Sequence, residues 1–283
     1  MEILKRAYYL ESIDEIDIVI ERMTELHIAI EKEKIERFTK INDKDKVPEG
    51  TEIAEILEQI RKTEDILPLA ELKYINAHKN EVLHLALKEM KEYAGDPIKY
   101  ATENDFFSLY IPMLLGQWEV RTASKYLIDL VACTDEEIDR TIGDMIAECY
   151  SVVLYKCFDG NIDYLKEMIE KDGISEFSTL AYLQVLTMFW IFDQNNLPEL
   201  RDYLEQLFIK RPETASQITG VIMEHHKDEL LPITEKCIAS EFYDPSIYGD
   251  REEYMFHFND FSNMETDRYL NYLPIHWRVV QVS

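Results

Sequence analysis

Hydrophobic residues recur at helical spacing along almost the whole chain, and the two-residue alternation typical of a β-strand is nearly absent. Apolar residues three and four positions apart line one side of a helix. Glycines and prolines stand at the ends of these segments, where helices commonly start or stop. The pattern predicts an all-α protein whose first helices span residues 14–40, 51–63 and 80–94.

Two changes along the chain indicate its domain organisation. Residues 42–50 are polar and contain Pro48 and Gly50, which is typical of a linker. After residue 105 the helices become much more apolar, which marks the main core. We therefore predict an N-terminal helical extension (residues 1–65), a main helical domain (residues 66–258) and a C-terminal tail (residues 259–283).

A repeated pattern, polar-Tyr-Leu-x-x-apolar-apolar, runs through the main domain. Its copies lie at residues 125–131, 163–169 and 202–208, with a looser copy at 232–238. A longer and more apolar helix is expected before each copy, at residues 106–118, 138–158, 180–192 and 218–225. A two-helix unit of roughly 40 residues matches the HEAT and armadillo repeats. Such a unit buries its apolar face only against its neighbours, so the sequence predicts an α-α superhelix of HEAT/armadillo-like helical pairs.

Helix-capping residues support this division into helices. Thr134 and Glu137 form a capping-box pattern at the start of one long helix. Gly160 can end that helix and Asn161 can cap the next one. Pro198 fits the first turn of the third short helix.

Several short motifs of the main domain carry a family resemblance. They are Phe106-Phe107-Ser108-Leu109-Tyr110, Leu114-Leu115-Gly116-Gln117-Trp118, Ile142-Gly143-Asp144-Met145-Ile146-Ala147-Glu148, Cys157-Phe158-Asp159-Gly160-Asn161 and Glu229-Leu230-Leu231-Pro232. On these, residues 67–250 resemble an uncharacterised bacterial family of HEAT-like helical proteins (domain of unknown function 1186). The resemblance implies a fold and brings no catalytic residue with it. Some members end in a cysteine-rich zinc motif, but residues 260–283 contain no cysteine here.

The charge balance bears on possible partners. Thirty Lys and Arg residues against fifty-six Asp and Glu residues give a net charge of −26. Such a field repels nucleic acids and anionic membranes and favours a basic protein partner. The alternative is that the charge only keeps the protein dissolved. The chain has no signal-peptide layout and no apolar stretch of about 20 residues, so we expect a cytoplasmic protein without a membrane segment.

The spacing of glycine and cysteine excludes several common chemistries. The eight glycines are too far apart for a Walker loop, a Rossmann fingerprint or a G-x-S-x-G elbow. The four cysteines, at positions 133, 149, 157 and 237, form no C-x-x-C motif, and we expect them to be free thiols. We expect no cofactor and no metal. His225 and His226 are adjacent, a spacing that rarely binds one metal ion, and we expect them at a polar helix end facing water.

One pair of carboxylates is a candidate site. Asp144 and Glu148 lie four residues apart on the helix expected at 138–158, and Tyr155 follows on the same side. Clustered carboxylates can bind a cation or act as a general acid and base. They can equally form hydrogen bonds with helix ends or loops of neighbouring repeats. We take Asp144, Glu148 and Tyr155 as the candidate binding residues.

These observations favour a non-enzymatic protein-interaction module that presents an acidic, curved helical surface to a basic protein partner. The alternative is a cation-binding protein or a hydrolase-type enzyme that uses Asp144 and Glu148.

Overall fold

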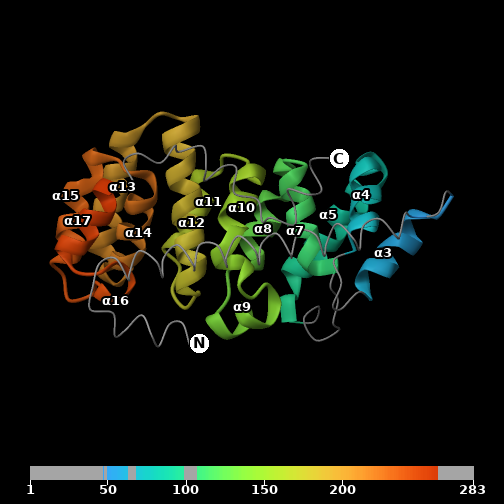
Figure 1. The fold of residues 1–283 in the computed structure, drawn as a ribbon, viewed down its shortest axis with the longest axis horizontal. Coiled ribbons are helices and arrows are strands. Elements are labelled where there is room, and N and C mark those ends of the chain that lie inside the picture. The colour runs from blue at the N-terminus through green and yellow to red at the C-terminus, as the bar shows by residue number, and fades with distance from the viewer. Residues whose placement is uncertain (1–46, 48–49, 63–67, 99–106, 261–283) are drawn as a thin grey trace, which may run out of the picture.

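The computed structural model describes residues 47, 50–62, 68–98 and 107–260 (Figure 1). Within these ranges all regular elements are helical and none is a strand, which confirms the all-α prediction. The helix expected at residues 14–40 lies outside the described residues, as do most of the linker and of the C-terminal tail. None of the described helices is both long enough and apolar enough to cross a membrane.

Among the described residues, three helices precede the main core. They are α3 (Ile53–Arg61), α4 (Leu69–Ala77) and α5 (Lys79–Gly95). Pro68 stands immediately before α4. Proline has no N–H, but at the start of a helix this group would have no partner within the helix, so no hydrogen bond is lost. The Trp118 indole nitrogen donates to Asn76 Oδ1 at 2.7 Å and so ties α4 to the following core.

The main core consists of helix pairs. The helices, in chain order, are α7 (Phe107–Gln117) and α8 (Ser124–Leu130), α10 (Ser151–Cys157) and α11 (Ile162–Ile169), α12 (Glu176–Met188) and α13 (Leu197–Lys210), and α14 (Ala215–His225) and α15 (Leu231–Ile238). The four copies of the sequence pattern fall on α8, α11, α13 and α15, as predicted. In each pair an apolar helix comes first and the patterned helix second.

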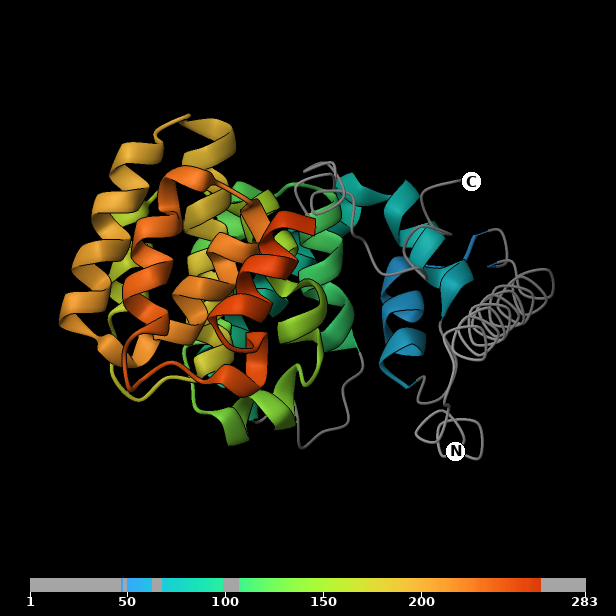
Figure 2. The same ribbon diagram turned by 60° about the vertical axis from the view of Figure 1, so that its left-hand side comes forward.

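The helices form two layers along the length of the molecule (Figures 1 and 2). In the first layer α7, α10, α12 and α14 pack successively against one another. The second layer contains α8, α11, α13 and α15, with α5 packed beside α8. Packing in the first layer is close, because a Cβ atom on Gly116 of α7 would lie 3.0 Å from Val153 Cγ1 of α10. α12 lies between α10 and α14, and its side chains are buried on almost every side.

The expected helix at residues 138–158 is not continuous. α9 (Asp135–Thr141) begins with the predicted capping box of Thr134 and Glu137, but it ends in a turn at Gly143. Gly143 has φ = +50°, a left-handed conformation that glycine adopts at low cost, and its N–H donates to Ile138 O at 2.9 Å. The chain then forms a π-helix, η2 (Ile146–Tyr150), before α10. α9 therefore projects from the lower edge of the molecule in Figure 1.

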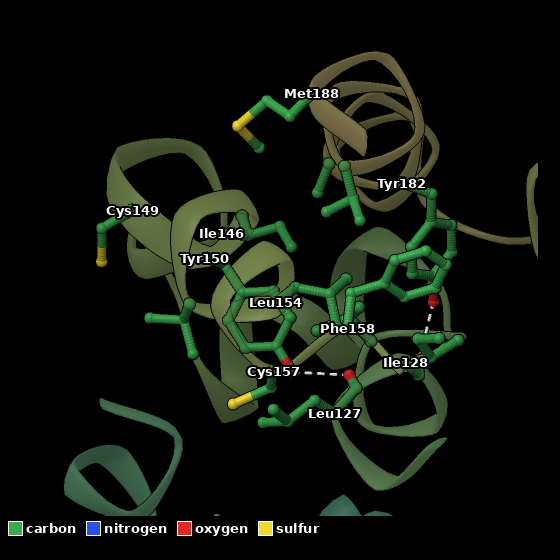
Figure 3. Packing of buried hydrophobic residues seen from close by; sticks show 14 of the residues in the cluster. Leu127, Ile128, Ile146, Cys149, Tyr150, Leu154, Cys157, Phe158, Tyr182 and Met188 are labelled. Carbon is green, nitrogen blue, oxygen red and sulfur yellow. Dashed lines mark hydrogen bonds between the residues drawn. The ribbon is translucent and has the colours of Figure 1, made fainter. Parts of the chain in front are cut away.

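Two buried tyrosines fasten the layers together at the end of α8. Tyr150 donates its hydroxyl to Leu127 O at 2.6 Å, and Tyr182 donates to Ile128 O at 2.7 Å (Figure 3). The last four carbonyls of an α-helix have no partner within the helix. Burial raises the pKa of both hydroxyls well above 10, so both remain donors. The tyrosines thus satisfy two buried carbonyl groups that the short helix leaves open.

A residue in the left-handed conformation follows each first-layer helix. The sequence analysis anticipated such a helix end only at Gly160. Residues with φ between +46° and +88° follow α7, α10, the π-helix η3 (Phe189–Asp193) that continues α12, and α14; they are Glu119, Gly160, Asn195 and His226. A left-handed residue lets the chain leave the helix and reverse direction. The recurring turn places the connections from the first to the second layer on one edge, the upper edge of Figure 1.

The described chain ends in α16 (Pro245–Tyr248) and α17 (Arg251–Asp260). Tyr254 of α17 donates its hydroxyl to Thr219 O of α14 at 2.8 Å. Arg251 forms an ion pair with Glu235 of α15. These contacts attach α17 to both layers.

Candidate functional site

The two predicted carboxylates, Asp144 and Glu148, do not lie on one regular α-helix. Asp144 lies in the turn between α9 and η2, with its side chain exposed. Glu148 lies within the π-helix η2, and its side chain is outside the described part of the structure. Because a π-helix has more residues per turn than an α-helix, a four-residue spacing does not align two side chains there as the sequence argument assumed. The pair as a site stays a prediction.

The structure brings Tyr155 together with a residue that the sequence argument missed. Tyr155 donates its hydroxyl to Asp193 Oδ1 at 3.2 Å, and its ring meets Phe192 edge-on at 6.5 Å between centroids. Partial burial, and secondarily the Asp193 carboxylate, raise the pKa of Tyr155 to about 12. The two residues lie 38 positions apart in the sequence, the length of one repeat. That spacing is the signal that could have identified Asp193.

Asp193 belongs to a row of exposed carboxylates, here called the acidic edge. Each lies at or just beyond the C-terminal end of a first-layer helix and before the paired second-layer helix, so the row repeats once per helix pair; its members are Glu119, Asp159, Asp193 and Asp228. Asp159 accepts hydrogen bonds from Ser124 Oγ at 3.3 Å and from the Asn161 N–H at 3.0 Å. Among the described residues, none of the four forms an ion pair. Their charges are therefore available to a partner.

The expectation for the histidine pair was wrong for His225. Its side chain is buried and meets the Phe192 ring edge-on at 5.9 Å. Burial, together with the nearby positive charges of Lys227 and His226, lowers the pKa of His225 to about 4. His226 ends α14 in the left-handed conformation, and its Nδ1 lies 3.0 Å from Phe258 O. The pair therefore faces the core and α17, because α17 covers the end of α14.

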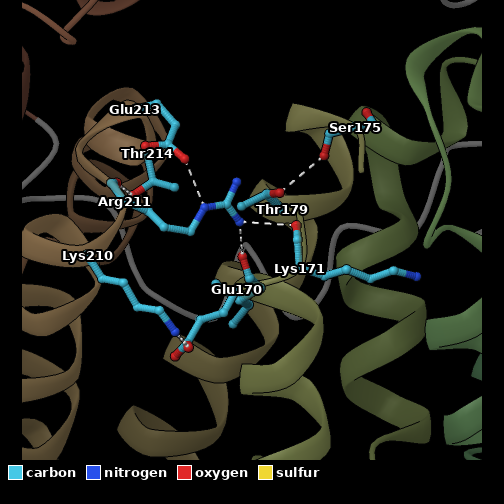
Figure 4. A network of polar contacts seen from close by, with 9 residues as sticks. Glu170, Lys171, Ser175, Thr179, Lys210, Arg211, Glu213 and Thr214 are labelled. Atoms are coloured by element: carbon cyan, nitrogen blue, oxygen red, sulfur yellow. Dashed lines mark hydrogen bonds and ion pairs between the residues drawn. The ribbon is translucent and has the colours of Figure 1, made fainter. Parts of the chain in front are cut away.

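A polar network joins α11 and α13 in the second layer (Figure 4). Arg211 donates from Nη1 to Ile169 O at 2.7 Å and to Lys171 O at 3.2 Å. These carbonyls are at the C-terminus of α11, where the helix dipole favours a cation. The Arg211 Nε donates to Glu213 at 2.9 Å, and Lys210 forms an ion pair with Glu170. The network fixes the end of one repeat to the end of the next.

The four cysteines are free thiols, as predicted. Three of them are buried, and burial raises the pKa of Cys157 and of Cys237 to about 12. Cys133 is half-buried, with its pKa raised to about 11. In the part of the chain that the structure describes, no group of three or more His, Cys, Asp or Glu side chains is arranged to hold a metal ion.

Comparison with known proteins identifies one family. A family model described as "Protein of unknown function (DUF1186)" matches residues 51–260. The match begins just before α3 and ends with α17, so it includes all the described helices. No curated protein and no solved structure matches the chain.

Proposed function

The chain belongs to the DUF1186 family, and we propose that it forms a HEAT-like α-α superhelix that acts as a non-enzymatic protein-interaction module. The spacing of its cross-helix contacts supports the superhelix. Several side-chain hydrogen bonds join residues 38 to 40 positions apart: Lys79 to Trp118, Tyr155 to Asp193, Gln184 to Glu224 and Lys210 to Glu170. Equivalent positions therefore touch from one repeat to the next, as in a stack of helix pairs.

The acidic edge is the observation that supports a basic partner. It presents one exposed carboxylate per helix pair along one side of the molecule. The segments that carry these carboxylates also contain two basic residues, Arg121 and Lys227. The net charge of −26 nevertheless adds long-range attraction for cations. A ligand with regularly placed basic groups would complement this row.

The usual separation of packed helices suggests a spacing for the row, and that spacing favours one kind of partner. Packed helices lie about 8–10 Å apart. A polyproline II segment rises about 3.1 Å per residue and has three residues per turn, so every third side chain points the same way at intervals of about 9 Å. We propose that the partner is an extended segment of a basic protein with Lys or Arg at every third position.

A peptide-binding measurement tests this proposal. A fluorescent peptide with lysine at every third position is compared with a peptide of the same composition whose lysines are contiguous. We expect the spaced peptide to bind more tightly, and its association rate to fall as salt is raised, because the Debye length shortens to about 8 Å at physiological ionic strength. Equal binding of the two peptides, or a salt-independent rate, would reject the proposal.

Matched variants locate the binding surface. The test variant replaces the four acidic-edge carboxylates by amides: Glu119→Gln, Asp159→Asn, Asp193→Asn and Asp228→Asn. The control removes four exposed carboxylates elsewhere: Asp139→Asn, Glu167→Gln, Glu241→Gln and Glu252→Gln. Exposed ion pairs contribute about 0.2–1 kcal/mol each, so the loss of four should weaken binding by at least about fourfold. An equal loss in the control would mean that only total charge matters.

The alternative function, a cation site or hydrolase-type site at Asp144 and Glu148, is tested by the Asp144→Asn and Glu148→Gln variants. A thermal stabilisation by divalent cations that both variants abolish would support it. An unchanged cation response in both variants would reject it.

A further inference from the structure

The two layers are held together along the stack by different kinds of contact. In the first layer α10 and α12 pack against one another, and the Tyr155 hydroxyl of α10 adds a hydrogen bond of 3.2 Å to Asp193 at the end of η3, which continues α12. In the second layer the described residues of α11 and α13 approach one another only sparsely. Contacts that join them include the polar network of Lys210 and Arg211 and the cation–π contact of Lys166 with Tyr203.

The contact of Lys166 permits movement. Its ammonium group lies 4.9 Å from the ring centroids of both Trp190 and Tyr203. A cation over an aromatic face is attracted over a range of positions up to about 6 Å, so this contact tolerates sliding. The ion pair between Lys210 and Glu170 involves partly exposed side chains, which salt screens.

A buried hydroxyl at the same junction has no partner. The Tyr203 hydroxyl is enclosed, yet no described residue forms a hydrogen bond with it. The Glu170 carboxylate and the Arg211 guanidinium are both close enough to influence its titration. An unsatisfied buried hydroxyl costs free energy, and a small shift between α11 and α13 would bring it a partner.

We propose that the stack bends about the α10–α12 contact, and that Lys210 and Arg211 form a clasp that sets the bend. While the clasp is closed, Arg211 holds the C-terminus of α11 against the end of α13. When it opens, α11 and α13 separate and the stack curves more strongly toward the first layer. A partner that offers a carboxylate to Arg211 or a cation to Glu170 would open it.

Distance measurements between spin labels test the clasp. One pair of labels spans the second layer at Glu167→Cys of α11 and Gln206→Cys of α13. The other spans the first layer at Lys156→Cys of α10 and Gln194→Cys, which directly follows η3. Both pairs are placed in a Cys133→Ser background, because the three remaining cysteines are buried.

The test variant is Lys210→Ala with Arg211→Ala, and Arg201→Ala is the control. Arg201 pairs with Asp202 on the same helix, so its removal deletes a charge without touching α11. We expect the second-layer distance to lengthen and broaden only in the test variant, with the first-layer distance and the far-UV circular dichroism unchanged. No change in the second-layer distance, or equal changes in both layers, would overturn the proposal.

A salt titration of the wild-type labelled protein decides the question if the double variant does not fold. At about 1 M NaCl the Debye length is about 3 Å, which weakens the Lys210–Glu170 ion pair. Lengthening confined to the second-layer pair supports the clasp. A second-layer distance that is independent of salt contradicts it.

Discussion

Replacing Tyr150 or Tyr182 by phenylalanine tests the link between the two layers. Each change keeps the aromatic ring and removes only the hydroxyl that donates to a carbonyl at the end of α8. Both hydroxyls and both carbonyls are enclosed by the core, so water cannot replace the lost donor. Each variant leaves one buried carbonyl unsatisfied.

The unsatisfied carbonyl determines the expected loss of unfolding free energy. Leaving a buried acceptor without a donor costs about 1–3 kcal/mol. With a urea dependence of about 1–3 kcal/mol per molar, a loss of about 2 kcal/mol lowers the urea midpoint by roughly 1 M. The two carbonyls belong to one helical turn, so we expect the double variant to lose less than the sum of the single losses.

Urea unfolding followed by circular dichroism measures these effects. Tyr155→Phe is the matched control, because its hydroxyl bonds to Asp193 at a more exposed position and at the longer distance of 3.2 Å. We expect the control to lower the midpoint by far less than either buried variant. Equal losses at all three positions would refute the argument that the α8 carbonyls depend on these hydroxyls.

Three further predictions concern single residues. The pKa of His225 is about 4 in the folded protein against 6.5 when unfolded, so the unfolded state binds the proton more readily. Stability should fall as pH drops from 6.5 toward 4, by about 3 kcal/mol in total, and His225→Phe should remove that dependence in acid titrations of unfolding. Glu119→Gly should raise the melting temperature and Gly160→Ala should lower it, each by the equivalent of about 1 kcal/mol, because both positions are left-handed. Gly116→Ala should cost about 1–3 kcal/mol by overpacking, whereas Gly95→Ala, with open space around it, should be neutral or stabilising; equal effects in calorimetry would contradict the close packing of α7 on α10.

Helix positions were predictable from sequence because periodicity and caps act locally. The patterned segments became α8, α11, α13 and α15, and Asn161 caps α11 as expected, its side chain accepting from the Tyr164 N–H at 3.2 Å. Periodicity could not reveal the turn at Gly143. Its apolar neighbours continue the helical pattern, and a single glycine inside such a pattern does not by itself mark the end of a helix.

The candidate site was predictable only in part, for a related reason. Tyr155 was identified, but its partner Asp193 lies one repeat away and meets it only after two helices have packed. The tyrosines of the repeated pattern also differ from one another in a way that the pattern does not show. Tyr164 has its hydroxyl at the rim, against Lys125 and Asp129, whereas the Tyr203 hydroxyl is enclosed because Trp190 covers that position.

Many cross-helix hydrogen bonds join residues only one repeat apart in the sequence, and this has a consequence for folding kinetics. Even the bond from Tyr182 to Ile128 spans 54 residues of a 283-residue chain. Because low sequence separation between contacting residues speeds folding, the chain should fold quickly and nucleate at more than one place. Helices at the ends of the row have neighbours on one side only, so they should open first. Amide hydrogen exchange should therefore slow progressively toward α12, which has neighbours on both sides.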